Sequence, residues 1–80
     1  MQKEFFTEEK AKEITKDFCG NPPVKERVEY HLWLIRWKLD CAEKRTYCTY
    51  MTLKEQNDEK VFFKKMISEG ERLMKEVENA

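Results

Sequence analysis

One histidine and three cysteines are the side chains of this sequence best suited to catalytic or metal chemistry. His31 is the only imidazole, and Cys19, Cys41 and Cys48 are the only thiols. A nucleophile would need His31 as its base, but Cys41 is ten residues from it, about 80° around a helix and three turns along. A glycine-rich turn that could bind an oxyanion is missing from the sequence. We therefore expect no catalytic residues, and we expect His31 to be a polar or half-buried side chain beside Arg27.

The cysteine spacing also argues against a metal site. Cys41 and Cys48 are seven residues apart, about 10.5 Å along a helix, which is too far to share a zinc ion or to form a disulfide within one helix. The sequence contains no CxxC, HxxxH or phosphate-binding pattern. We expect no metal and no cofactor, and we interpret both thiols as small core hydrophobes. An interchain disulfide is the alternative if the face that bears them is a two-fold interface.

Charge and composition limit the compartment and the class of partner. Sixteen basic and sixteen acidic side chains give a formal net charge of zero, which argues against a nucleic-acid binder. Residues 1–6 become charged before any apolar leader forms, and the longest apolar run, at 32–35, is far too short to span a membrane. The number of cysteines is odd, so they cannot all pair within one chain. Together these features predict a soluble cytoplasmic protein with reduced thiols and no membrane contact.

Helix signals dominate the chain, and they predict a single all-α domain over 1–80. Thr7 is a good N-cap and is followed by Glu8 and Glu9 in the first turn. Gly20 ends the first helix before Pro22. The expected architecture is a three-helix bundle with helices at about 8–18, 23–55 and 59–78, in which the second and third form a helical hairpin.

The least certain boundary is the end of the second helix. Residues 46–52 are rich in β-branched and aromatic side chains that also suit a strand, but no second strand is available to pair with it. We therefore interpret 46–55 as helix and place the break at 56–58. The third helix has an apolar stripe, and Gly70 within it either allows close helix approach or marks a kink. The stripe comprises Phe63, Met66, Gly70, Leu73 and Val77, flanked by Phe62, Ile67 and Met74.

The central helix is apolar on two opposite faces when it is drawn at about 100° per residue. One face is aliphatic and comprises Val24, Val28, Leu32, Ile35, Leu39, Ala42 and Leu53. The other, the aromatic face, comprises Tyr30, Trp33, Leu34, Trp37, Cys41 and Cys48. The basic ridge between them is formed by Arg27, His31, Lys38 and Arg45. A helix with two apolar faces is normally sandwiched, so Trp33 and Trp37 either fill the core or leave an open surface for a partner.

These patterns favour a small non-enzymatic protein-binding module: an adaptor, regulator or inhibitor of a larger partner, binding another protein, a second copy of itself, or both. Its size and charge are typical of small bacterial or phage accessory proteins. Tryptophan, tyrosine and arginine dominate interface hot spots, so the expected partner-binding residues are Tyr30, Trp33, Leu34, Arg36, Trp37 and Cys41. The alternative is a nucleic-acid-binding regulator that uses the basic ridge.

Overall fold

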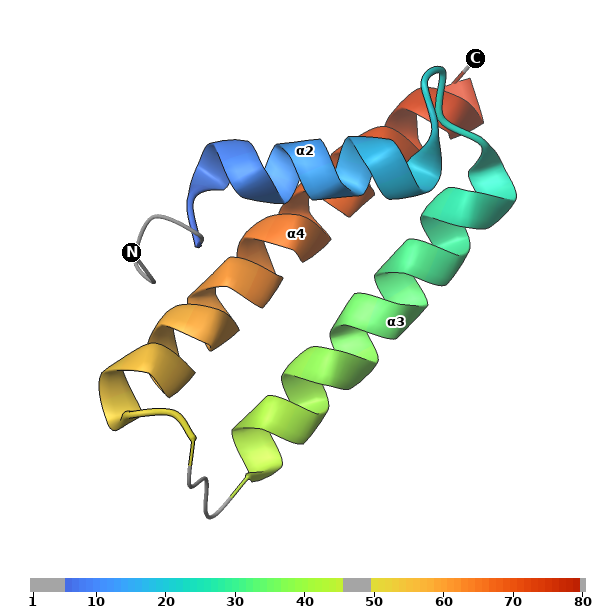
Figure 1. Ribbon diagram of the computed structural model, residues 1–80. Coiled ribbons are helices and arrows are strands. Elements are labelled where there is room, and N and C mark those ends of the chain that lie inside the picture. Colours follow the sequence, from blue (N-terminus) through green and yellow to red (C-terminus); the bar gives the residue numbers. More distant parts are fainter. Residues whose placement is uncertain (1–5, 46–49, 80) are drawn as a thin grey trace.

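A computed structural model of the chain describes residues 6–45 and 50–79. In these ranges it contains three helices, α2 (Glu8–Cys19), α3 (Lys25–Lys44) and α4 (Leu53–Asn79), and no strand. Helices α3 and α4 run antiparallel as a hairpin, and α2 lies across both of them (Figure 1). The predicted all-helical fold, with a short first helix and a hairpin of two longer ones, is confirmed.

Both ends of α2 follow from local sequence. The Thr7 hydroxyl accepts a hydrogen bond from the Lys10 backbone N–H at 3.1 Å, which satisfies one of the unpaired donors of the first turn. Gly20 ends the helix with a φ of 99°, a left-handed value that favours glycine, and its N–H donates to the Lys16 carbonyl at 2.9 Å. The predicted range of 8–18 is therefore correct to within one residue.

The boundary between α3 and α4 differs from the prediction. Helix α3 ends at Lys44, residues 50–52 are not helical, and 53–58 belong to α4, so the extension of the second helix to 55 and the break at 56–58 are both wrong. Residues 46–49 lie outside the described ranges. A capping box explains the early start of α4: the Glu55 N–H donates to the Thr52 hydroxyl at 3.1 Å, and the Thr52 N–H donates to the Glu55 carboxylate at 2.8 Å.

The core lies where α2 crosses the hairpin. One cluster joins Ala11 of α2, Ile35 of α3 and Phe62 and Met66 of α4. A second cluster joins Cys19, Val28, Leu32 and Leu73. The aliphatic face of α3 is thus the buried one, except that Leu39 is half-buried, Val24 is 45% exposed and Leu53, on α4, is 85% exposed. On α4 the predicted stripe is shifted slightly, because Phe62 is buried and Phe63 is only half-buried.

Gly70 allows α3 and α4 to approach closely. A Cβ atom at this position would lie 2.8 Å from Leu32 Cδ2 and 3.2 Å from His31 Cδ2. Carbon atoms in contact are normally 3.5–4.0 Å apart, so even a methyl group does not fit without movement of its neighbours. Of the two roles considered for this glycine, the structure supports close helix approach.

Candidate functional site

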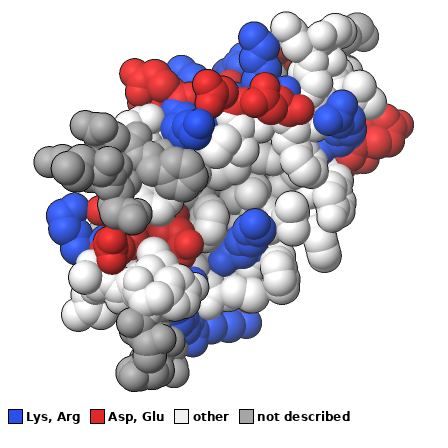
Figure 2. All heavy atoms as spheres, in the orientation of Figure 1, with Lys and Arg blue, Asp and Glu red and all other residues white. Residues whose placement is uncertain are grey.

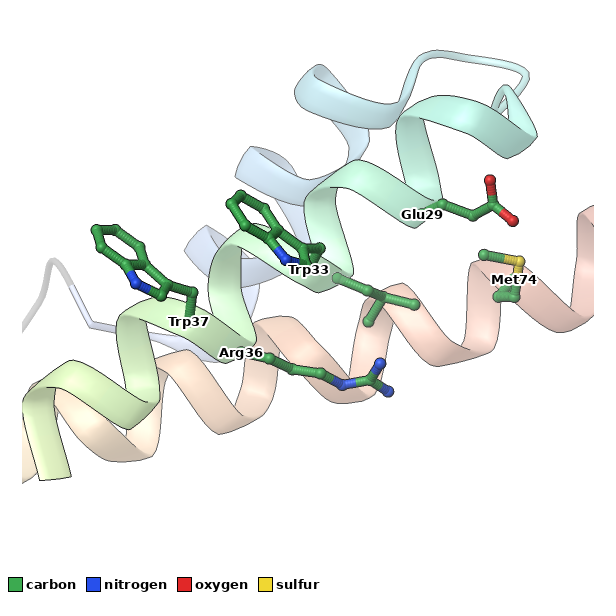
Figure 3. Close-up of a pocket in the computed structure, with 6 residues that line it drawn as sticks. Glu29, Trp33, Arg36, Trp37 and Met74 are labelled. Atoms are coloured by element: carbon green, nitrogen blue, oxygen red, sulfur yellow. The ribbon is translucent and has the colours of Figure 1, made fainter.

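The aromatic face of α3 is open to solvent. Tyr30, Trp33 and Trp37 are 53%, 60% and 54% exposed, respectively. Of the two roles considered for the tryptophans, filling a three-helix core is therefore wrong and the open surface is observed: α2 and α4 both pack against other sides of α3. Figure 3 shows the indoles of Trp33 and Trp37 projecting from the same side of α3, one turn apart, while Arg36 extends toward α4.

Ring stacking holds one edge of this face in place. The Phe18 and Tyr30 ring centroids are 5.8 Å apart with an interplanar angle of 19°, and those of Tyr30 and Trp33 are 5.9 Å apart at 21°. Offset stacked rings at such distances attract one another. Because Phe18 belongs to α2, the short first helix orders the tyrosine that borders Trp33 instead of covering the tryptophans.

The other predicted binding residues surround the indoles. Leu34 is half-buried, and Cys41 is an exposed free thiol. The Arg36 guanidinium donates to the Glu71 carboxylate of α4 at 2.8 Å, with both side chains about half exposed. A surface ion pair of this kind contributes little stability, but it fixes the direction of the guanidinium beside the aromatic face.

A shallow groove of about 490 Å³ runs from the indoles to α4. Its lining comprises Glu29, Leu32, Trp33, Arg36, Trp37 and Met74. Three of these residues, Glu29, Leu32 and Met74, were not among the binding residues predicted from the sequence. Glu29 precedes Trp33 by one helical turn, so helical spacing could have identified it, whereas Met74 reaches the groove only through packing of α4 on α3.

The basic ridge of the alternative function is not assembled as expected. His31 is buried, with 1% exposure, and the half-buried Arg45 is paired with the Glu59 carboxylate at 3.2 Å. Only Arg27 and Lys38 remain exposed. On the face drawn in Figure 2, lysine and arginine side chains lie in separate groups, several of them beside aspartate and glutamate, and form no extended basic patch.

His31 lies at the junction of the three helices. Its Nε2 atom is 3.2 Å from the Thr15 hydroxyl of α2, its ring is 5.5 Å from that of Phe18, and it forms a hydrogen bond with the Met66 backbone of α4. Burial lowers the pKa of His31, an effect that the hydrogen bond to Met66 partly opposes. His31 was expected to be polar or half-buried beside Arg27, but it is fully buried, because α2 covers this side of α3.

The thiol buried nearby has little nucleophilic character. Burial raises the pKa of Cys19, although the positive charge of Arg27 partly offsets this. A raised pKa keeps the thiol protonated at neutral pH, and the thiolate is the reactive form. The expectation that Cys41 is also a core hydrophobe is wrong, since its side chain is exposed. Cys48 lies outside the described ranges.

Across residues 6–45 and 50–79, no group of three or more histidine, cysteine or acidic side chains is arranged to hold a metal ion. None of the helices that the structure describes is both long and apolar enough to cross a membrane. Comparison of the chain with models of protein families, with curated proteins and with solved structures finds no match.

Proposed function

We propose that this chain is a non-enzymatic protein-binding module that acts as an adaptor, regulator or inhibitor of a larger partner. The observation that carries the proposal is the exposure of Trp33 and Trp37 by more than half on one side of a continuous helix. Tryptophan and tyrosine are the side chains most enriched at the energetic centres of protein interfaces. A small domain with a marginal core gains more by burying them than by leaving them in water.

The size of the exposed surface supports the same function. A fully exposed aromatic side chain offers roughly 150–250 Å², so Tyr30, Trp33 and Trp37 together present roughly 250–420 Å² at their observed exposures. This is comparable to the largest apolar patch on a typical monomeric protein, which is often functional. The adjoining groove, with Arg36 at its edge, offers hydrogen-bond donors beside the apolar surface, as interfaces usually require.

The thiols support a reducing compartment for this function. Cys19 and Cys41 are both free, and an exposed free cysteine such as Cys41 persists most readily where glutathione keeps thiols reduced. We therefore propose that the module acts in the cytoplasm. We do not propose a nucleic-acid function, because only two of the four residues of the basic ridge are exposed.

A capture experiment with paired variants tests the proposal. The tagged chain is used to capture proteins from lysate in parallel with W33A/W37A and with a control, L53A/V61A. The control removes two exposed apolar side chains from α4, where Leu53 is 85% and Val61 43% exposed. The wild-type chain and the control should retain the same protein at similar yield, and W33A/W37A should lose it while keeping its helical circular dichroism.

Equal retention of that protein by the tryptophan variant would show that binding does not use the aromatic face. Loss of helical structure in W33A/W37A would also count against the proposal, because it would mean that the indoles serve mainly to hold the fold together.

A further inference from the structure

The outward side of α3 carries charge at both ends of its aromatic face. At about 100° per residue, Glu26, Trp33, Trp37 and Lys44 all lie within roughly 40° of one another around the helix. All four are exposed. They point directly away from the buried side of α3, where Val28 and Ile35 lie. We call the line formed by Glu26, Tyr30, Trp33, Trp37 and Lys44 the outer stripe; it is acidic at its start and aromatic in its middle, and it ends on Lys44, whose exposed ammonium is 3.0 Å from the Asp40 carboxylate one turn earlier.

The outer stripe is complementary to itself. Seven residues separate Glu26 from Trp33, and seven separate Trp37 from Lys44. In an antiparallel pair of helices, a two-fold axis midway between Trp33 and Trp37 therefore sets each Trp33 opposite Trp37 of the second copy. The same axis sets each Glu26 opposite Lys44 of the second copy. A parallel pair would instead bring Glu26 against Glu26 and Lys44 against Lys44.

We propose that the partner of the aromatic face is a second copy of this chain, bound through α3 in this antiparallel register. The inference rests on the proposed use of the aromatic face as a protein-binding surface, and it assigns that face to a second copy instead of to the larger partner. It uses the symmetry rule that a two-fold interface contacts itself with one patch on each subunit. Opposite charges at the rim then select the antiparallel orientation over the parallel one.

The area of the outer stripe predicts a weak dimer. The three aromatic side chains present roughly 250–420 Å² per copy, whereas a stable interface of standard size buries about 800 Å² per partner. The charged ends and the neighbouring Asp40 and Cys41 enlarge the contact, and a helix of 20 residues is about 30 Å long. We therefore expect weak, transient self-association.

The antiparallel register also determines whether the exposed Cys41 thiols of two copies can form a disulfide. The two-fold axis passes level with position 35, so Cys41 is six residues from it, and the two Cys41 residues of a dimer are about 18 Å apart along the helices. A disulfide needs Cα atoms within about 7 Å. The dimer therefore forms no Cys41–Cys41 bond, in contrast to the interchain disulfide that the sequence left open.

Intrinsic fluorescence and mass provide the first test. Trp33 and Trp37 are the two tryptophans of the chain, so its indole emission reports on the outer stripe alone. In sedimentation equilibrium from about 1 to 500 µM, the mass should rise from 9.8 kDa toward twice that value. The emission should shift to shorter wavelength over the same concentrations. A monomer throughout this range, with unchanged emission, would overturn the dimer.

Charge exchange tests the register. E26K and K44E each bring like charges together at both ends of the stripe and should weaken self-association roughly tenfold to thirtyfold. An equimolar mixture of the two variants restores both opposite-charge pairs, so it should associate about as tightly as the wild-type chain. K38E changes the net charge as much as K44E does, but it lies off the stripe and should alter the dissociation constant less than about threefold.

The outcomes separate the two proposals. A monomeric chain whose capture of a larger protein still depends on Trp33 and Trp37 would overturn the dimer and leave the proposed function standing. A dimer whose strength is unaffected by E26K and K44E, or whose mixed variants stay dissociated, would overturn the antiparallel register. Circular dichroism of each variant ensures that loss of association is not loss of folding.

Discussion

Substituting Gly70 by alanine tests how tightly α3 and α4 are packed. In an exposed helix, this change would raise the free energy of unfolding by about 1 kcal/mol, since glycine is a poor helix former. Here the new methyl group would lie 2.8 Å from Leu32 Cδ2 and 3.2 Å from His31 Cδ2. Forcing extra volume into a packed core costs roughly 1–3 kcal/mol. We therefore expect G70A to lower the free energy of unfolding by about 1 kcal/mol.

Urea unfolding followed by circular dichroism measures the change, and a fall in melting temperature of about 4–8 °C should accompany it in a domain of this size. S68A is the matched control, because Ser68 is exposed and lies on the same helix two residues earlier. It should be neutral or slightly stabilising. In an L32V background the contact with Leu32 Cδ2 is gone, while those with His31 Cδ2 and the Cγ position of residue 32 remain. G70A should therefore destabilise this variant less than the wild-type chain, with a coupling energy of up to about 1 kcal/mol.

A rise of about 1 kcal/mol in the free energy of unfolding of G70A, equal in both backgrounds, would refute this reasoning. Such a result would mean that only helix propensity acts at position 70 and that the two helices are farther apart than described.

Three further predictions concern the helix junction and the connection between α3 and α4. The pKa of His31 is lowered from 6.5 in the folded chain, so the unfolded chain takes up the proton first. The free energy of unfolding should therefore decline as the pH falls through about 6.5, levelling off below the folded pKa. Urea midpoints between pH 5 and 7.5 should show this slope in the wild-type chain and a flatter one in H31Q. T52A removes the hydroxyl that caps α4 and should cost about 1 kcal/mol by thermal unfolding; no loss would contradict the capping role. A double-mutant cycle of R45M and E59Q should give a coupling of about 1 kcal/mol, since both side chains are 22% exposed; a coupling near zero would show that the ion pair contributes nothing.

Local sequence was sufficient for the ends of α2 and for the presence of three helices. Thr7 and Gly20 act on backbone groups within a few residues of themselves, so their effects can be predicted without knowing the fold. The same kind of signal was available at Thr52 and Glu55, a capping box in the sequence. A longer second helix was predicted instead, because the strand-forming residues at 46–52 have no second strand to pair with.

The two apolar faces of α3 were visible in the sequence, but which of them is buried was not. Periodicity gives the angle of each side chain around a helix and says nothing about which neighbour covers it. The placement of α2 decides this: it buries His31 against Thr15 and leaves Trp33 and Trp37 in solvent. The groove between α3 and α4 likewise depends on Met74 and on the ion pair of Arg36 with Glu71. These contacts join residues 16 or more positions apart, and only the tertiary packing brings them together.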